Sequence, residues 1–414
     1  MNILIFNKKW DLLGVMLCFH FIIISSFNWN VTFRDGSILL VVVATGFTLM
    51  KRYKLSEIQI RNIKYIFVWY LLFVILAVLS LKWSYEDTSN SPFFTAMFRI
   101  LLILLCICIY INSWEKVVSF LKMWITAITI MAILALLTSG IENYGSIGYG
   151  GITNQWRNEI GHLSAIAAVI AFILNKMEKK KKYNYIVIII NIFSVICTGS
   201  RGALMVLAFF VVLYGISEPS LNKRVHNILV LIMLFLVTLV LIFNVPFLNA
   251  IFGERLQQAF MGLNSSDMST IDRSTYLVNA MTLFHSKPLL GWGIDAFRYA
   301  QYSELNFRTI VYSHTNYGEI LADLGIVGFV TYYWYYVFIL YKSYKNKNTN
   351  FLIRLVFLLI LYCLVFEVET IRFYAYMEIY LMAIMGAIIL MSLNVKLKRQ
   401  FKKAGFRVYA NGVD

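Results

Sequence analysis

The feature that most constrains this chain is a series of apolar runs, each about 15–25 residues long, separated by short polar breaks. A run of this length crosses the hydrocarbon core of a membrane as an α-helix. Hydrophobic residues make up 60% of the chain and charged residues 14%, which excludes an ordinary soluble globular domain. The pattern therefore predicts an all-α, polytopic membrane protein.

We predict about twelve transmembrane helices in a single integral-membrane domain that covers residues 1–414. Two segments should stand apart from the bundle: a large external loop at 247–313, containing short helices, and a basic cytoplasmic tail at 394–414. An even number of spans would put both ends of the chain on one side. The predicted spans are 11–29, 37–50, 64–81, 93–111, 117–138, 160–175, 183–199, 202–217, 226–246, 314–341, 352–368 and 374–393.

The lysines predict the orientation of these spans. With the N-terminus inside, 20 of the 22 lysines fall on the inner side, including Lys179 to Lys182 and those of the tail. Inner loops of membrane proteins are enriched in Lys and Arg. The net charge of +16 is then explained by topology and by membrane lipids, so no nucleic-acid partner is expected.

The predicted outer side contains many arginines but only two of the 22 lysines. A guanidinium offers a planar fork that matches phosphate oxygens better than an ammonium does. Within 247–313, however, there are five basic and five acidic residues, so the loop has no net charge that would attract anions. Phosphate binding must therefore be assigned to individual arginines. The outer arginines are Arg34, Arg157, Arg201, Arg255, Arg273, Arg298, Arg308 and Arg372.

Two of these arginines are well placed for a phosphate. Residues 273–285 predict a helix with Asp272 as its N-cap and Lys287-Pro288 after its end, and Arg273 stands at its head beside free backbone N–H groups. Arg201 lies in a turn between two short spans. We expect it to be drawn below the membrane surface, where a charged side chain is costly and usually functional.

His314 stands where the chain re-enters an apolar run. On a continuous helix it would share a face with Gly318, Gly325 and Gly328, glycines that would allow close helix packing. Glu319 would point about 140° away from His314 on an ideal helix of 3.6 residues per turn. Asn316, Glu319 and Asp323 share that other face, and we expect them to orient neighbours of His314 or an arginine.

The outer segment 139–159 is rich in glycine and ends in a polar sequence that contains Arg157. It is interpreted either as a re-entrant loop that lines a cavity or as a flexible connection. Arg157 and Arg298 are weaker candidates for the substrate pocket, chosen for their side of the membrane and their sequence context.

Three motifs in this order resemble the O-antigen ligase/polymerase superfamily. They are Gly-Ser-Arg-Gly at 199–202, Arg273 followed by Pro-Leu-Leu-Gly-x-Gly at 288–293, and His314 followed by Gly325 and Gly328. The resemblance covers about residues 150–340. Members usually have Asn, Ser or Gln after the histidine, where this chain has Thr315, which keeps a hydroxyl.

The resemblance implies a membrane glycosyltransferase that takes glycans from undecaprenyl diphosphate without metal, nucleotide or other cofactor. Arg201 and Arg273 would bind the diphosphate, and His314 would be the essential histidine. The chemistry agrees, because a diphosphate leaving group needs charge stabilisation and a sugar hydroxyl needs a base. The alternative for His314 is a histidine that caps a helix at the membrane interface. Asn316, Glu319, Arg157 and Arg298 complete the predicted substrate site.

The resulting hypothesis is a polysaccharide polymerase of the bacterial plasma (inner) membrane, with its active site facing the periplasm or exterior. Its substrates would be lipid-linked donor and acceptor repeat units of O-antigen, capsule or exopolysaccharide. A chain-length regulator and a flippase are further candidate partners.

Three other functions compete with the polymerase. An O-antigen ligase would use the same residues but transfer the glycan to lipid A-core. A twelve-span transporter would share the layout, although the two halves of the chain show no matching pattern. A metal-dependent lipid-linked glycosyltransferase would have only Glu86-Asp87 as candidate ligands, which is weak evidence.

Overall fold

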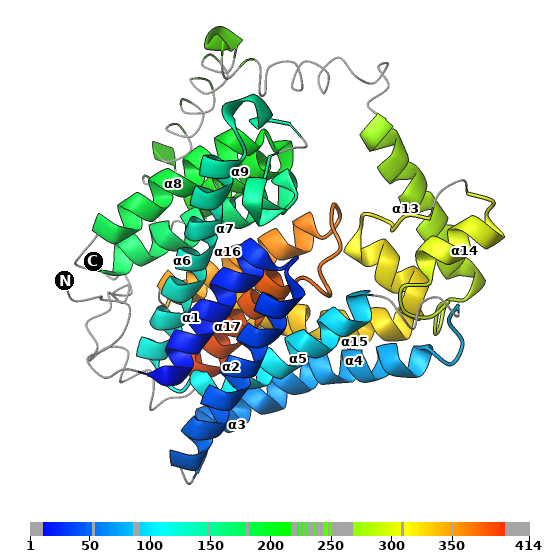
Figure 1. Cartoon of the computed structure of the whole chain (residues 1–414), viewed down its shortest axis with the longest axis horizontal. Helices are drawn as coiled ribbons and strands as arrows, with labels where there is room; N and C mark the ends of the chain where they lie inside the picture. Colours follow the sequence, from blue (N-terminus) through cyan, green and yellow to red (C-terminus); the bar gives the residue numbers. More distant parts are fainter. Residues whose placement is uncertain are drawn as a thin grey trace.

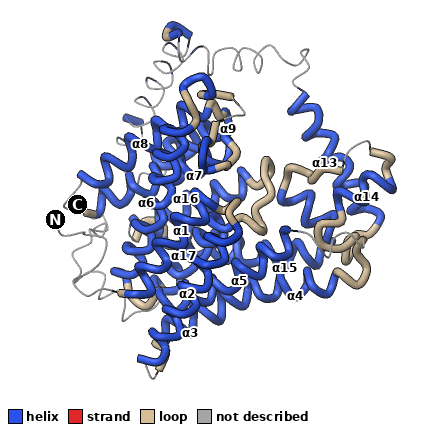
Figure 2. The backbone as a smooth tube through the Cα atoms, in the orientation of Figure 1, coloured by secondary structure: helices blue, strands red, loops and turns tan. Residues whose placement is uncertain are grey.

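The computed structural model describes most of the chain as helix. It covers residues 11–51, 54–85, 92–146, 149–178, 182–216, 268–307, 310–349 and 351–393, together with isolated positions between 222 and 249. Within these residues there is no β-strand (Figure 2). The predicted all-α fold class is confirmed.

The N-terminal helices form most of the bundle (Figure 1). The short α3 (Glu57–Asn62) continues through a π-helical turn, η1 (Ile63–Phe67), into α4 (Val68–Ser80), so these form one long helix. The others are α1 (Leu12–Phe27), α2 (Val31–Lys51), α5 (Pro92–Tyr110), α6 (Trp114–Thr138), α7 (Arg157–Met177), α8 (Lys182–Thr198) and α9 (Arg201–Ile216).

Five more helices follow the segment around residues 217–267. They are α13 (Met268–Ser286), α14 (Phe297–Glu304), α15 (Asn316–Asn346), α16 (Phe351–Phe366) and α17 (Tyr376–Ser392). The first two lie within the predicted loop 247–313, as expected for short helices there. Because α13 already begins at Met268, Asp272 is not its N-cap, and that detail of the prediction was wrong.

The chain is a multi-pass membrane protein. Six described helices are long and apolar enough to cross a membrane, and five shorter apolar helices accompany them. Together these coincide with eleven of the twelve predicted spans. The span predicted at 226–246 lies largely outside the described residues, so the count of twelve stays a prediction.

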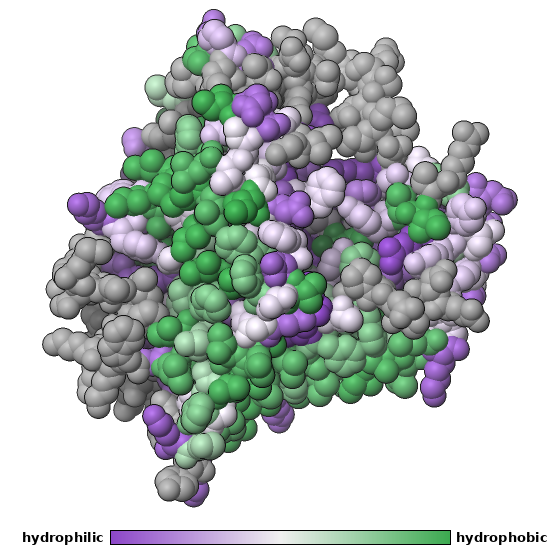
Figure 3. Space-filling model, in the orientation of Figure 1, coloured by the Kyte–Doolittle hydropathy of each residue, from purple (hydrophilic) through white to green (hydrophobic). Residues whose placement is uncertain are grey.

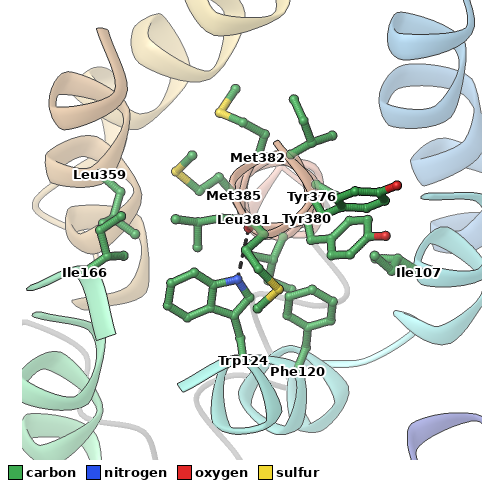
Figure 4. Close-up of a cluster of buried hydrophobic side chains, with 14 of the residues drawn as sticks. Ile107, Phe120, Trp124, Ile166, Leu359, Tyr376, Tyr380, Leu381, Met382 and Met385 are labelled. Carbon is green, nitrogen blue, oxygen red and sulfur yellow. Dashed lines mark hydrogen bonds between the residues drawn. The ribbon is translucent and has the colours of Figure 1, made fainter. Parts of the chain in front are cut away.

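Helix α17 is the centre of the bundle. Every one of its residues is buried, as expected for a helix that is apolar all round. Figure 4 shows Trp124 of α6 beneath it, donating its indole N–H to the carbonyl of Met377 at 3.0 Å. On the periphery, exposed apolar side chains such as Leu39 and Leu40 of α2 provide the lipid-facing surface.

A second, smaller core lies beside this bundle, between α13, α14 and the start of α15. Its buried members are Tyr276, Ala280, Leu283, Phe297, Ala300 and Ala322. Figure 1 shows the α13–α14 pair standing apart from the α7–α9 group, with the connection between α16 and α17 (orange) projecting between them. Figure 3 shows the surface hollowed in this region, with hydrophilic residues on its walls.

Candidate active site

Helix α15 is interrupted at Gly325, whose backbone angles (φ 62°, ψ −161°) belong to a region that essentially only glycine occupies. The interruption frees backbone groups on both sides of the break. The amide N–H groups of Trp292 and Gly293 donate to the carbonyls of Ala322 (3.0 Å) and Asp323 (2.7 Å). The predicted helix-packing role of Gly325 was therefore wrong.

The pairing continues beyond the break, where the N–H of Ile326 donates to the carbonyl of Pro288 at 2.9 Å. The Pro-Leu-Leu-Gly-x-Gly motif thus acts as a short strap along the broken helix. The Asp323 carboxylate completes it by accepting from the backbone N–H groups of Asp295 and Phe297, each at 2.7 Å. This fixes the start of α14 against α15.

Gly325→Ala is expected to destabilise the protein by at least about 2 kcal/mol, because a side chain adds strain at this φ and has no room. A methyl group at Gly325 would lie 2.4 Å from backbone atoms of Leu289. Gly46→Ala is the matched control, since nothing lies within 4 Å of its methyl group. Thermal unfolding in detergent measures both variants. Equal unfolding temperatures for them would contradict the role assigned to Gly325.

His314 lies just before α15 and not on it. Its φ of +59° is left-handed, and α15 begins only at Asn316, so the predicted shared helical face with Gly318 does not exist. The imidazole instead packs beside two tyrosine rings. Its centroid is 4.2 Å from that of Tyr312 and 5.5 Å from that of Tyr276 on α13, the latter nearly parallel.

Glu319 stabilises the unusual backbone next to His314. This buried carboxylate accepts from the backbone N–H of Ser313 at 2.7 Å, and the Ser313 hydroxyl donates to the carbonyl of Thr315 at 2.8 Å. Glu319 thus orients the residues next to His314, as the sequence predicted. Direct contact of Glu319 with a substrate stays a prediction that its burial does not favour.

Arg273 lies on α13, three residues before Tyr276, so the two share a helix face. Its charge acts on the Tyr312 hydroxyl next to His314 and on the buried ring of His162 on α7. Burial raises the pKa of Tyr312, and the Arg273 guanidinium partly offsets that rise. The charge of Arg273 therefore reaches both the Tyr312 hydroxyl beside His314 and His162 on α7.

Arg201 is the first residue of α9, directly after the turn that contains Gly199 (φ 59°). The Ser200 hydroxyl caps this helix by accepting from the N–H of Ala203 at 3.3 Å. Gly202 packs so tightly that a methyl group there would lie 2.6 Å from Nε2 of His162. The turn that carries Arg201 therefore packs against His162, the histidine on which the charge of Arg273 also acts.

His162 received no role in the sequence analysis, and the structure places it, buried, between the turn of Arg201 and Tyr362. Its Nδ1 lies 3.4 Å from the Tyr362 hydroxyl, which in turn lies 3.5 Å from Nη2 of Arg372. Arg372 also forms an ion pair with Glu378. A signal was present in the sequence, since a histidine inside an apolar span is rare and usually partnered.

The connection between α16 and α17 is fixed by Asn316. The amide donates to the Glu367 carboxylate (3.0 Å) and to the Tyr333 hydroxyl (2.8 Å), while its oxygen accepts from the backbone N–H groups of Arg372 (2.8 Å) and Phe373 (3.1 Å). Asn316 is fully buried. The structure thus gives it a structural role, and its predicted contact with substrate stays unsupported by the geometry.

Glu367, which directly follows α16, anchors the same connection. The sequence analysis did not single it out. Its carboxylate accepts from the hydroxyls of Tyr333 (2.5 Å) and Tyr336 (2.6 Å) on α15. Its place at the end of an apolar run was the available signal.

The two weaker arginine candidates have structural contacts. Arg157 donates to the carbonyl of Gly145 at 2.5 Å, which ties down the glycine-rich segment. The described part of that segment contains two 3-10 turns, η3 (Ile141–Asn143) and η4 (Gly151–Thr153), and η4 packs against α1 and α6. Whether the segment is re-entrant stays a prediction. Arg298 pairs with Asp295 and lies over the Phe93 ring. Substrate binding by either arginine stays a prediction.

Residues 186–333 match the family model described as O-antigen ligase. The matched segment contains Arg201, Arg273 and His314. The match is consistent with the O-antigen ligase/polymerase superfamily, which the sequence motifs resemble. A comparison with curated proteins finds no match.

Members of the matched family are glycosyltransferase-like enzymes, and the match supports a membrane protein of O-antigen biosynthesis. Within the described part of the chain, no three His, Cys, Asp or Glu side chains gather as a group that could hold a metal ion. Glu86-Asp87, the metal ligands considered above, lie outside the described residues.

Proposed function

We propose that this protein polymerises lipid-linked repeat units into O-antigen, capsule or another exopolysaccharide. The observation that supports this best is that Arg201, Arg273 and His314 all lie within the segment that matches the O-antigen ligase family. The turn of Arg201 packs against His162, on which the charge of Arg273 also acts. The site would face the periplasm or exterior of the plasma membrane, consistent with the lysine-poor side of the chain.

In the proposed reaction, a sugar hydroxyl of the acceptor repeat unit attacks the anomeric carbon of the donor glycan. The new glycosidic bond forms as the bond from that carbon to undecaprenyl diphosphate breaks. His314 takes the proton from the attacking hydroxyl, and Arg201 and Arg273 stabilise the negative charge of the departing diphosphate. No metal or cofactor takes part.

Purified protein should convert lipid-linked repeat units into a ladder of longer lipid-linked glycans. The substrate is obtained by extracting lipid from source cells that lack the gene, in which unpolymerised repeat units accumulate. Activity should survive EDTA, because the proposed charge stabilisation comes from arginines alone. Loss of activity in EDTA that returns with a divalent cation would contradict the metal-free mechanism.

An O-antigen ligase is the second candidate, favoured by the description of the matched family. Its acceptor would be lipid A-core, so adding that acceptor to the same assay separates the two. Transfer to lipid A-core without elongation of the repeat units would replace the polymerase proposal. A gene cluster with a flippase favours the polymerase, and a core-oligosaccharide cluster favours the ligase.

A further inference from the structure

The strap at 288–293 carries two exposed leucines beside a membrane-crossing helix. Leu289 is 67% exposed and Leu290 is 46% exposed. The N–H of Val327 on α15 donates to the carbonyl of Leu289 at 3.2 Å, so the strap lies directly against this helix. Val327 and Val330 are themselves exposed, on a helix that is long and apolar enough to cross a membrane. The two leucines therefore extend an apolar face that α15 already presents.

The depth of the strap follows from the distance along α15 to its basic end. Sixteen residues lie between Gly325 and Lys342. At 1.5 Å per residue they span about 24 Å, whereas the hydrocarbon core of a membrane is about 30 Å thick. Lys342 and Lys345 belong at the headgroups on one side of the membrane. The break at Gly325 and the strap beside it thus lie at or just below the opposite boundary of the hydrocarbon core.

The helix that contains α4 gives the same depth independently. Fifteen residues lie between Lys64, in η1, and Ser80 at the end of α4. They span about 23 Å. The hydroxyl of Ser80 accepts from the backbone N–H of Ile294 at 2.9 Å, so the residue that follows the strap lies level with the end of α4. Two helices therefore place this segment near the same boundary.

Basic and aromatic side chains border the two leucines, as they do at membrane–water interfaces. Lys82 and Trp83 are exposed in the turn directly after α4. Lys287 is exposed directly before the strap, and its ammonium lies 3.4 Å from the ring centroid of Trp292. Lys82 and Lys287 are the only two lysines on the predicted outer side. A lysine can lay its stem along apolar surface while its ammonium reaches a headgroup phosphate.

The backbone of the strap is paired in the way that contact with lipid requires. The N–H groups of Trp292 and Gly293 donate to carbonyls of α15, and the carbonyls of Pro288 and Leu289 accept from N–H groups of the same helix. Pro288 has no N–H of its own. Irregular backbone at membrane depth needs such protein partners, because hydrocarbon offers none.

We propose that the strap docks the module formed by α13 and α14 onto the phospholipids of the outer leaflet. Leu289 and Leu290 insert among the acyl chains, and the ammonium groups of Lys82 and Lys287 contact the headgroup phosphates. Part of the predicted external loop 247–313 thus lies at the membrane boundary, which fixes the height of the module beside the bundle. This docking does not depend on the proposed transfer reaction.

Spin labels in the purified full-length protein, reconstituted in vesicles of phosphatidylethanolamine and phosphatidylglycerol, test the docking. EPR power saturation compares collisions of each label with oxygen, which concentrates in lipid, and with a nickel chelate, which stays in water. Labels at Leu289→Cys and Leu290→Cys should favour oxygen, as should a label at Leu39→Cys, an exposed position on α2. Tyr302→Cys, at an exposed position on α14, is the matched control, and its label should favour the nickel chelate.

Labels that favour the nickel chelate at both leucines, as at Tyr302→Cys, would overturn the docking. The wild-type chain, labelled in the same way, measures the background from its natural cysteines, which are buried or partly buried. Thermal unfolding checks that each variant is folded, and either leucine variant alone is sufficient for the test.

The lysines are tested in the Leu289→Cys protein. Lys82→Gln combined with Lys287→Gln should lower the oxygen-to-nickel collision ratio by about twofold or more, because two charges that attract phosphates are lost. Lys345→Gln, at the other end of α15, is the control and should leave the ratio unchanged. An unchanged ratio in the double lysine variant would overturn the role assigned to Lys82 and Lys287.

Discussion

His314→Ala is expected to lower the transfer rate by about 10²–10⁴-fold while leaving donor binding nearly unchanged, because a general base contributes mainly in the transition state. His314 lies outside α15, between the ring of Tyr312 and that of Tyr276. Removing the imidazole leaves Arg201 and Arg273 in place. Single-turnover rates and donor affinity of the purified variant measure the two effects separately.

The pH–rate profile distinguishes the base from an electrostatic role. A base must be unprotonated to accept the hydroxyl proton, so wild-type activity should fall at acid pH. A protonated His314 that helps to hold the diphosphate predicts the reverse, with better activity at lower pH and weaker donor binding in the Ala variant. His285→Ala, at the exposed end of α13, is the control and should behave as the wild type.

Local sequence patterns predicted the helical elements and singled out three candidate residues for the site. Apolar runs of membrane-spanning length are a strong local signal, and the order of Arg201, Arg273 and His314 was sufficient to suggest one site. Their conformations were not predictable in the same way. The left-handed backbone of His314 is held through Ser313 by Glu319, and the break at Gly325 is stabilised by a strap more than thirty residues upstream.

The roles that sequence patterns did not predict belong to residues whose partners lie far away in sequence. Asn316 was a candidate for substrate binding, but its amide hydrogen-bonds to Tyr333 and to a segment about fifty residues later, around Glu367. His162 looked like an ordinary buried histidine because nothing local indicates that Gly202 and Arg273 approach it. Side-chain type and helical period describe one element at a time, whereas these roles arise from contacts between several elements.

Arg273→Lys and Arg201→Lys are each expected to lower kcat by about 10²–10³-fold, the usual cost of losing one oriented donor to a developing charge. Lysine keeps the charge but loses the planar fork that matches two phosphate oxygens. Turnover of lipid-linked repeat units by purified variants measures the effect. Arg61→Lys, in an exposed ion pair with Glu57 on α3, is the matched control and should leave turnover unchanged.

The double variant tests whether the two arginines hold one diphosphate. If both act on the same leaving group near His162, the second substitution removes an interaction that the first has already weakened. The combined loss should then be smaller than the product of the two single losses. Fully multiplicative losses would mean that the arginines act on separate groups. Near-normal glycan length in both single Lys variants would contradict the proposal that the two arginines bind the diphosphate.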